Sequence, residues 1–180
     1  MPSKNKPGTE HVCQRNRVEH LATEKKPFHF TDSGLPNVYL IGIKYFTCEC
    51  GNVVAEIPAL KPLMRLIARD LIANPGALNG EEIRFLRKRL GMRAVDFAKA
   101  LGLEPETLSR IENNKQPASE QSDKLIRLVY ALSVKDDPQL AVEAKKIVED
   151  LISSWKAEHA PTRITKKISD NEWTDFPRAA

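Results

Sequence analysis

The stretch AVDFAKALGLEPETLSRIEN, residues 94–113, decides the fold. Its apolar residues and its one glycine are spaced as in two short helices joined by a tight turn. Ala98 is small enough to lie where two crossing helices come closest, and Gly102 follows four residues later, where the turn requires a positive φ. Leu108 and Ile111 stand one helical turn apart, which places both on the buried side of the second helix. The stretch therefore predicts a helix-turn-helix.

The opposite face of the second helix is predicted to point outward. Its residues are Pro105, Glu106, Ser109 and Arg110. A recognition helix presents such a face to the major groove of DNA. The alternative is an αα-hairpin in another kind of helical protein, because short motifs also occur outside their usual fold.

If the second helix reads DNA, its side chains take different roles. Arg110 is the first candidate for a base contact, because its guanidinium matches the O6 and N7 acceptors of guanine. Glu106 can accept a hydrogen bond from cytosine N4, and the hydroxyls of Ser109 and Thr107 can donate to a phosphate or a base edge. The residues expected to contact phosphates are Arg93, Asn113 and Lys115.

Two further helices are predicted beside the motif. The first covers residues 81–90, because Asn79 and Glu82 have the spacing of a capping box. The second covers residues 119–132. The residues expected to face the core are Ile83, Leu86 and Leu90 on the first helix, and Leu125, Leu128, Val129 and Leu132 on the second. These segments predict a DNA-binding domain over residues 77–133, close to the smallest size that buries a core unaided.

The composition agrees with this interpretation. The chain has 180 residues, a formal net charge of +4 and a pI near 9.0. A mild basic excess suits phosphate contact, although many basic surfaces are only solvated. Residues 1–6 lead into no apolar segment, and no apolar run approaches the roughly 18 residues of a membrane span. Three cysteines without a regular spacing favour a reducing cytoplasm.

The N-terminal third reads differently from the centre. Residues 1–27 are polar and predict a disordered tail. Within residues 28–59, the runs 38–46 and 52–57 predict two strands of a hairpin, because they are rich in β-branched and aromatic residues. A linking helix is predicted within residues 60–76.

The C-terminal part predicts one long helix and a tail. The helix covers residues 137–159, with Asp137 as N-cap and Pro138 at its first position. Its apolar stripe comprises Leu140, Ala144, Ile147, Val148, Leu151 and Trp155. This stripe is either the seam of a homodimer or a face packed on the chain's own domain. The tail, residues 160–180, is expected to form a hairpin that pairs Ile164 and Ile168 with Trp173 and Phe176.

Four segments carry a family resemblance. They are SGLPNV (33–38), CECG (48–51), EIP (56–58) and NGEEIRFLRK (79–88). Over roughly residues 28–132 the chain resembles the YgiT/MqsA-type zinc-finger and helix-turn-helix proteins, whose DNA-binding half is similar to the lambda-repressor (XRE) class. The resemblance implies a mainly α fold with a small N-terminal β region, in which a lambda-repressor-like domain follows a zinc-ribbon-like β-hairpin. It also implies a cytoplasmic bacterial regulator, usually dimeric, that represses its own operon and sometimes binds a toxin.

The metal half of that pattern is incomplete. Members of the family usually carry two Cys-x-x-Cys pairs, which give zinc four tetrahedral ligands. This chain has Cys48-x-Cys50, and only Cys13 stands near the place of the other pair, with His29 as a further candidate. Either these four residues hold zinc, or Cys48 and Cys50 are thiols on a hairpin that binds no metal.

Two other functions compete with DNA binding. The chain could be a protein-interaction antitoxin whose strands grip a toxin, with DNA binding secondary. It could also be an enzyme that uses Cys48 and Cys50, but no general base or oxyanion device keeps motif distance from these cysteines. Family repressors often have glutamine at the start of the first motif helix, where this chain has Ala94, with Arg93 beside it as the replacement contact. We expect a non-enzymatic regulator that binds double-stranded DNA.

Overall fold

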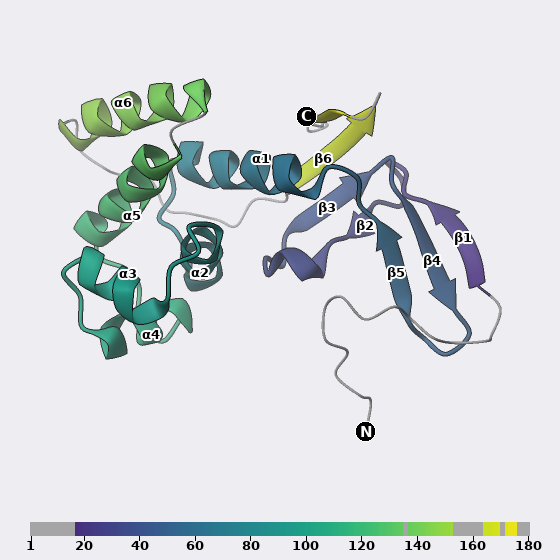
Figure 1. The fold of residues 1–180 in the computed structure, drawn as a ribbon, viewed down its shortest axis with the longest axis horizontal. Helices are drawn as coiled ribbons and strands as arrows, with labels where there is room; N and C mark the ends of the chain where they lie inside the picture. Colours follow the sequence, from purple (N-terminus) through teal and green to yellow (C-terminus); the bar gives the residue numbers. More distant parts are fainter. Residues whose placement is uncertain (1–16, 135–136, 153–163, 170–171, 176–180) are drawn as a thin grey trace. The chain divides into compact units, whose positions relative to one another are not determined.

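A computed structural model describes residues 17–134, 137–152, 164–169 and 172–175. The chain divides into two compact units (Figure 1). The first comprises Met1–Leu63 with Arg163–Ala180, and the second comprises Met64–Thr162. Each unit is described by itself below.

The first unit contains a three-stranded antiparallel sheet in the order β1-β4-β5. Its strands are β1 (Arg17–Leu21), β4 (Lys44–Cys48) and β5 (Val53–Glu56). Strand β1 corrects the prediction of a disordered tail over residues 1–27; residues 1–16 lie outside the described part. The polar segment can form a strand because its partner stabilises it: Lys44 Nζ lies 2.8 Å from Glu19 Oε1, and His20 Nε2 lies 2.8 Å from Thr47 Oγ1. Cross-strand pairs of this kind replace an apolar pattern.

The run 38–46 forms two strands and not the one predicted. It breaks at Gly42, whose φ is +83°, and its halves β3 (Val38–Ile41) and β4 belong to different sheets. Glycine is required here twice over. A left-handed φ is strained for other residues, and a Cβ would lie 2.7 Å from the carbonyl oxygen of Ile168.

The second sheet of the first unit has four strands in the order β2-β3-β6-β7. Besides β3, its strands are β2 (Phe28–His29), β6 (Ile164–Ser169) and β7 (Glu172–Asp175), and the 3-10 turn η1 (Thr31–Ser33) follows β2. The predicted C-terminal hairpin is confirmed for Ile168, which pairs with Trp173. Ile164 instead pairs with Val38 in the parallel ladder between β3 and β6, and Phe176 lies outside the described residues. The β region is therefore not purely N-terminal.

The second unit is helical. Its helices are the later part of α1 (Leu60–Ala73), then α2 (Gly80–Arg89), α3 (Ala94–Ala100), α4 (Pro105–Glu112), α5 (Glu120–Ser133) and α6 (Pro138–Ile152). The predicted capping box opens α2, where Asn79 Oδ1 accepts from the Glu82 N–H and Glu82 Oε2 from the Asn79 N–H, both at 2.9 Å. Ile83 and Leu86 are fully buried, as predicted, and Leu90 is half-buried.

The C-terminal end of α1 is held inside the helical unit, although its sequence predicted only a linking helix within residues 60–76. The buried guanidinium of Arg127, on α5, donates to the carbonyl oxygens of Leu71, Ile72 and Asn74 at 2.7–2.9 Å. It also bonds Asp123 Oδ2 at 2.8 Å. A cation at a helix C-terminus satisfies carbonyl groups that lack partners within the helix. Residues from Met64 onward therefore form part of the DNA-binding domain's core.

This contact also corrects the predicted face of α5. The apolar stripe at Leu125 and Leu132 does not close the core, because these side chains are 37 % and 62 % exposed. The buried face instead carries Ile126 and Tyr130, together with the Asp123–Arg127 pair. The apolar spacing predicted the wrong face because a charged pair with bonded partners occupies the core side.

Helix α6 begins as predicted. Asp137 Oδ1 accepts from the backbone N–H groups of Gln139 and Leu140 at 3.1 and 3.3 Å. Leu140 and Ala144 are buried, and α6 packs on α5 (Figure 1). The first part of the apolar stripe is thus covered by the chain itself, whereas Trp155 lies outside the described residues. None of the helices in the described ranges is long and apolar enough to span a membrane.

Candidate nucleic-acid interface

Helices α3 and α4 form the predicted helix-turn-helix (Figure 1). Gly102 has a φ of +66°, so the turn occurs where the sequence placed it. Ala98 and Leu108 are fully buried and Ile111 is nearly so, which confirms the predicted inner faces of both helices. The core therefore fixes which side of α4 faces outward.

The outer face of α4 is polar. Glu106, Ser109 and Arg110 are exposed, while Pro105 and Thr107 are half-buried. Among the contacts of the described residues, the side chains of Glu106 and Arg110 take part in no hydrogen bond or ion pair. Both charged groups can therefore meet a ligand without first breaking a bond inside the protein.

The N-terminal end of α4 is open to an anion. Its N-cap, Glu104, is extended and makes no side-chain cap hydrogen bond, and Pro105 occupies the first turn. The backbone N–H groups of the first turn thus lack the usual side-chain acceptor. Such groups and the positive end of the helix dipole attract a phosphate. The carboxylates of Glu104 and Glu106 reduce this attraction.

Three residues predicted as phosphate contacts have different surroundings. Exposed Arg93, at the start of α3, donates to Asp96 at 2.6 and 3.0 Å, and this bond lowers the pKa of Asp96. Asn113 ends α4: its Nδ2 donates to the Ser109 carbonyl at 2.7 Å. Lys115 is exposed in the turn after α4. Of the three, Lys115 is presented most openly.

A buried ion pair, which the sequence analysis missed, holds the end of α4 against α2. Glu112 is 5 % exposed, and its two carboxylate oxygens accept from Nε and Nη2 of Arg87 at 2.6 and 2.8 Å. Arg84 Nη2 donates to the Glu112 carbonyl at 2.6 Å and to Asn113 Oδ1 at 2.8 Å. A bidentate pair fixes orientation as well as distance. These arginines therefore position the recognition helix.

A second contact holds the same two helices together at Gly80. The Gly80 N–H donates to Asn114 Oδ1 at 2.7 Å, and Asn114 Nδ2 donates to Glu81 Oε2 at 2.8 Å. Asn114 has a φ of +54°, a conformation that asparagine tolerates better than most residues. The backbones approach so closely that only glycine fits at position 80.

The proposed zinc ligands do not gather in the described part of the chain. Cys48 is buried at the end of β4 and Cys50 is exposed in the following turn, where the Gly51 N–H donates to the Cys48 carbonyl at 2.8 Å. His29 Nε2 lies 2.7 Å from the Pro36 carbonyl oxygen, and its ring stacks on Tyr39. Within the described ranges, no three His, Cys, Asp or Glu side chains are close enough to hold a metal ion. Cys13 lies outside these ranges.

Comparison with known proteins places the site. Residues 83–128 match the family model described as Helix-turn-helix. This range is an XRE-type DNA-binding domain. It covers α2 to most of α5, including the Arg87–Glu112 pair and the outer face of α4. No curated protein and no solved structure matches the chain.

Proposed function

We propose that this protein is a cytoplasmic, sequence-specific DNA-binding regulator that represses its own operon. The observation that carries the proposal is the outer face of α4. It offers Glu106, Ser109 and Arg110 from a helix whose inner face is buried and whose end is held by the Arg87–Glu112 pair. The protein acts by binding and not by catalysis.

In this proposal base contacts and phosphate contacts come from different residues. Arg110 donates two hydrogen bonds to guanine, and Glu106 accepts one from cytosine. Ser109 and Thr107 donate to a base edge or a phosphate. The backbone phosphates are bound by the N-terminal turn of α4 and by Arg93, Asn113 and Lys115. For Arg93 and Asn113, binding means exchanging the bonds they make within the protein.

The regulator is proposed to bind its operator as a homodimer. One recognition helix reads only a few base pairs, which is too little to select a site from a genome. Two copies related by two-fold symmetry double the reading on a pseudo-palindrome. Because α6 already buries Leu140 and Ala144 within the chain, the exposed Val148 and the later part of that helix remain for the contact between copies.

The decisive experiment selects binding sites from random duplex DNA and then maps the protein's protection of its own upstream region. We expect one enriched sequence with two half-sites about one helical turn apart, and the same sequence upstream of the gene. Light scattering on the free protein should give about twice its 20.3 kDa. Selection that enriches no sequence would contradict the proposal.

A second candidate function is that of an antitoxin that binds a partner protein through its strands. The observation in its favour is that Val18, Leu21, Val53 and Val54 are all exposed on β1 and β5. Coexpression with a neighbouring small reading frame tests it. A toxic product, neutralised by the wild type but not by a Val18→Ser/Val53→Ser variant that still binds the operator, supports this function.

A further inference from the structure

Tyr130 is a buried polar residue that the DNA-reading face does not use. It lies on α5 and is 3 % exposed, but its hydroxyl takes part in no hydrogen bond with the described part of the chain. A buried hydroxyl without a partner costs free energy that a bonded one does not. The group is therefore placed to donate to something other than the protein.

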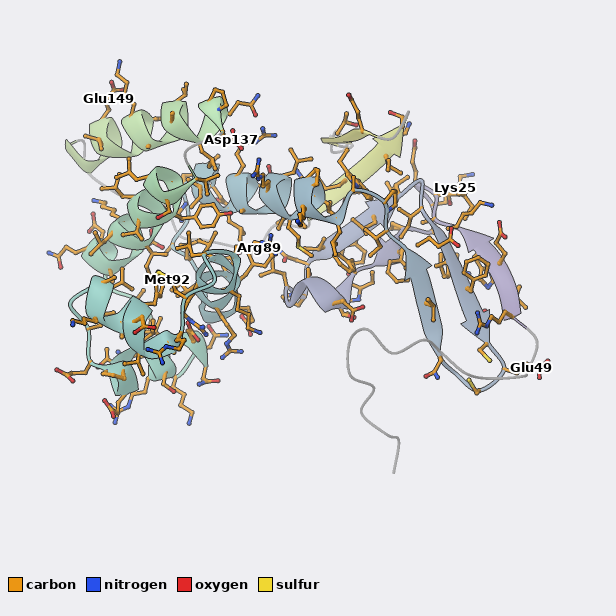
Figure 2. All side chains as sticks on the ribbon, viewed as in Figure 1. Lys25, Glu49, Arg89, Met92, Asp137 and Glu149 are labelled. Atoms are coloured by element: carbon orange, nitrogen blue, oxygen red, sulfur yellow. The ribbon has the colours of Figure 1, made fainter. Side chains whose placement is uncertain are left out.

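The surroundings of this hydroxyl are positively charged. Arg127, one helical turn earlier on α5, is bonded to the Leu71 and Ile72 carbonyls, so this face of α5 lies against α1. Burial raises the pKa of Tyr130, and the charges of Arg89 and Arg65 act against that rise. Arg65 comes from α1 and Arg89 from the end of α2. In Figure 2 the labelled Arg89 lies on the side of α2 that is turned toward α1.

Neither arginine is neutralised within the protein. Both are exposed, and the contacts of the described residues include no hydrogen bond or ion pair for their side chains. Arg87, Arg93 and Arg127, by contrast, are each bonded to a carboxylate.

One carboxylate, that of Asp137, does act on the hydroxyl from the start of α6. Its Oδ1 is engaged in capping that helix. The site thus combines two cations and one hydroxyl donor against one carboxylate that is already bonded.

We infer that Arg65, Arg89 and Tyr130 form a binding site for a phosphate group. Two guanidinium groups from different helices can donate to separate phosphate oxygens, and the phenol hydroxyl can donate to a third. None of the three residues belongs to α4, so the site is separate from the base-reading face and does not rest on the proposed function. The phosphate comes either from the DNA backbone or from a phosphorylated small molecule.

The first measurement uses inorganic phosphate on the full-length protein at constant ionic strength. At about twenty times its Kd, phosphate should raise the Tm of the wild type by about 5 °C relative to chloride. Arg65→Gln/Arg89→Gln should lose this shift, while Lys145→Gln/Lys146→Gln, which removes the same charge from α6, should keep it. Tyr130→Phe should weaken phosphate binding about fivefold, the effect of one neutral hydrogen bond.

The second measurement identifies the source of the phosphate. If it belongs to DNA, the arginine double variant should lower the salt dependence of binding to a random duplex by about one to two phosphate contacts relative to the lysine control. If it belongs to a small molecule, that slope stays unchanged and the phosphate-dependent Tm shift remains specific to the wild type. The inference is overturned if neither the Tm shift nor the slope distinguishes the two double variants.

Discussion

Replacing Gly80 by alanine should loosen the recognition helix even though alanine is the better helix former. An added Cβ would lie 2.3 Å from the Ile111 carbonyl oxygen, 2.7 Å from Asn114 Oδ1 and 2.8 Å from the Glu112 carbonyl carbon. Two of these atoms belong to the backbone at the end of α4, so α2 and α4 must separate.

The size of the effect follows from three contributions. Alanine gains roughly 0.5–1 kcal/mol over glycine within a helix. Overpacking costs about 1–3 kcal/mol, and weakening the hydrogen bond from Gly80 to Asn114 costs about 1 kcal/mol. We therefore expect Gly80→Ala to lower the free energy of unfolding by about 2 kcal/mol, measured by urea titration with an unchanged m-value.

Gly102→Ala is the matched control, because it adds the same methyl group with no atom within 4 Å. Its positive φ still costs roughly 1–2 kcal/mol, but it leaves the contact between α2 and α4 intact. Gly80→Ala should therefore reduce operator binding by more than its stability loss explains, while Gly102→Ala should not. A more stable Gly80→Ala protein would refute the close approach of the two helices.

Three further outcomes are expected. Glu112→Ala should cost about 3 kcal/mol because it strands the Arg87 guanidinium, whereas Glu106→Ala on the exposed face should change the unfolding free energy by less than about 0.5 kcal/mol; equal losses would show that the ion pair does not hold the domain. Burial raises the pKa of Tyr130, so its stabilisation is present below its ordinary pKa of 10.0 and is lost as pH rises above it; urea midpoints of the wild type should fall relative to Tyr130→Phe between pH 9 and about pH 11, and parallel curves would contradict this. Metal analysis of protein purified without chelator should give well below one equivalent of zinc, and a full equivalent that is lost in Cys48→Ser would restore the zinc interpretation.

The helix-turn-helix could be predicted from the sequence because its signals are local. Ala98, Gly102, Leu108 and Ile111 lie within fourteen residues of one another, and each acts through the geometry of its own helix or turn. The capping of α2 by Asn79 is equally local. Such signals do not depend on where distant segments of the chain lie.

The features that sequence reasoning missed depend on distant partners. Glu112 reads as a solvated charge until α2 brings Arg87 beside it. Arg127 reads as a surface residue of α5 until the carbonyl groups of α1, more than fifty positions away, become its acceptors. Strand β1 has no apolar alternation of its own and forms through pairing with β4.

The most direct test of DNA reading by α4 compares Arg110→Ala with Lys115→Ala. Dissociation constants are measured on the selected operator and on a random duplex at one salt concentration. We expect Arg110→Ala to lose about 1–3 kcal/mol on the operator and little on the random duplex, because only the operator presents the guanine it reads. Lys115→Ala should weaken both duplexes about equally, as a phosphate contact does. Equal losses of Arg110→Ala on the two duplexes would contradict base reading by this helix.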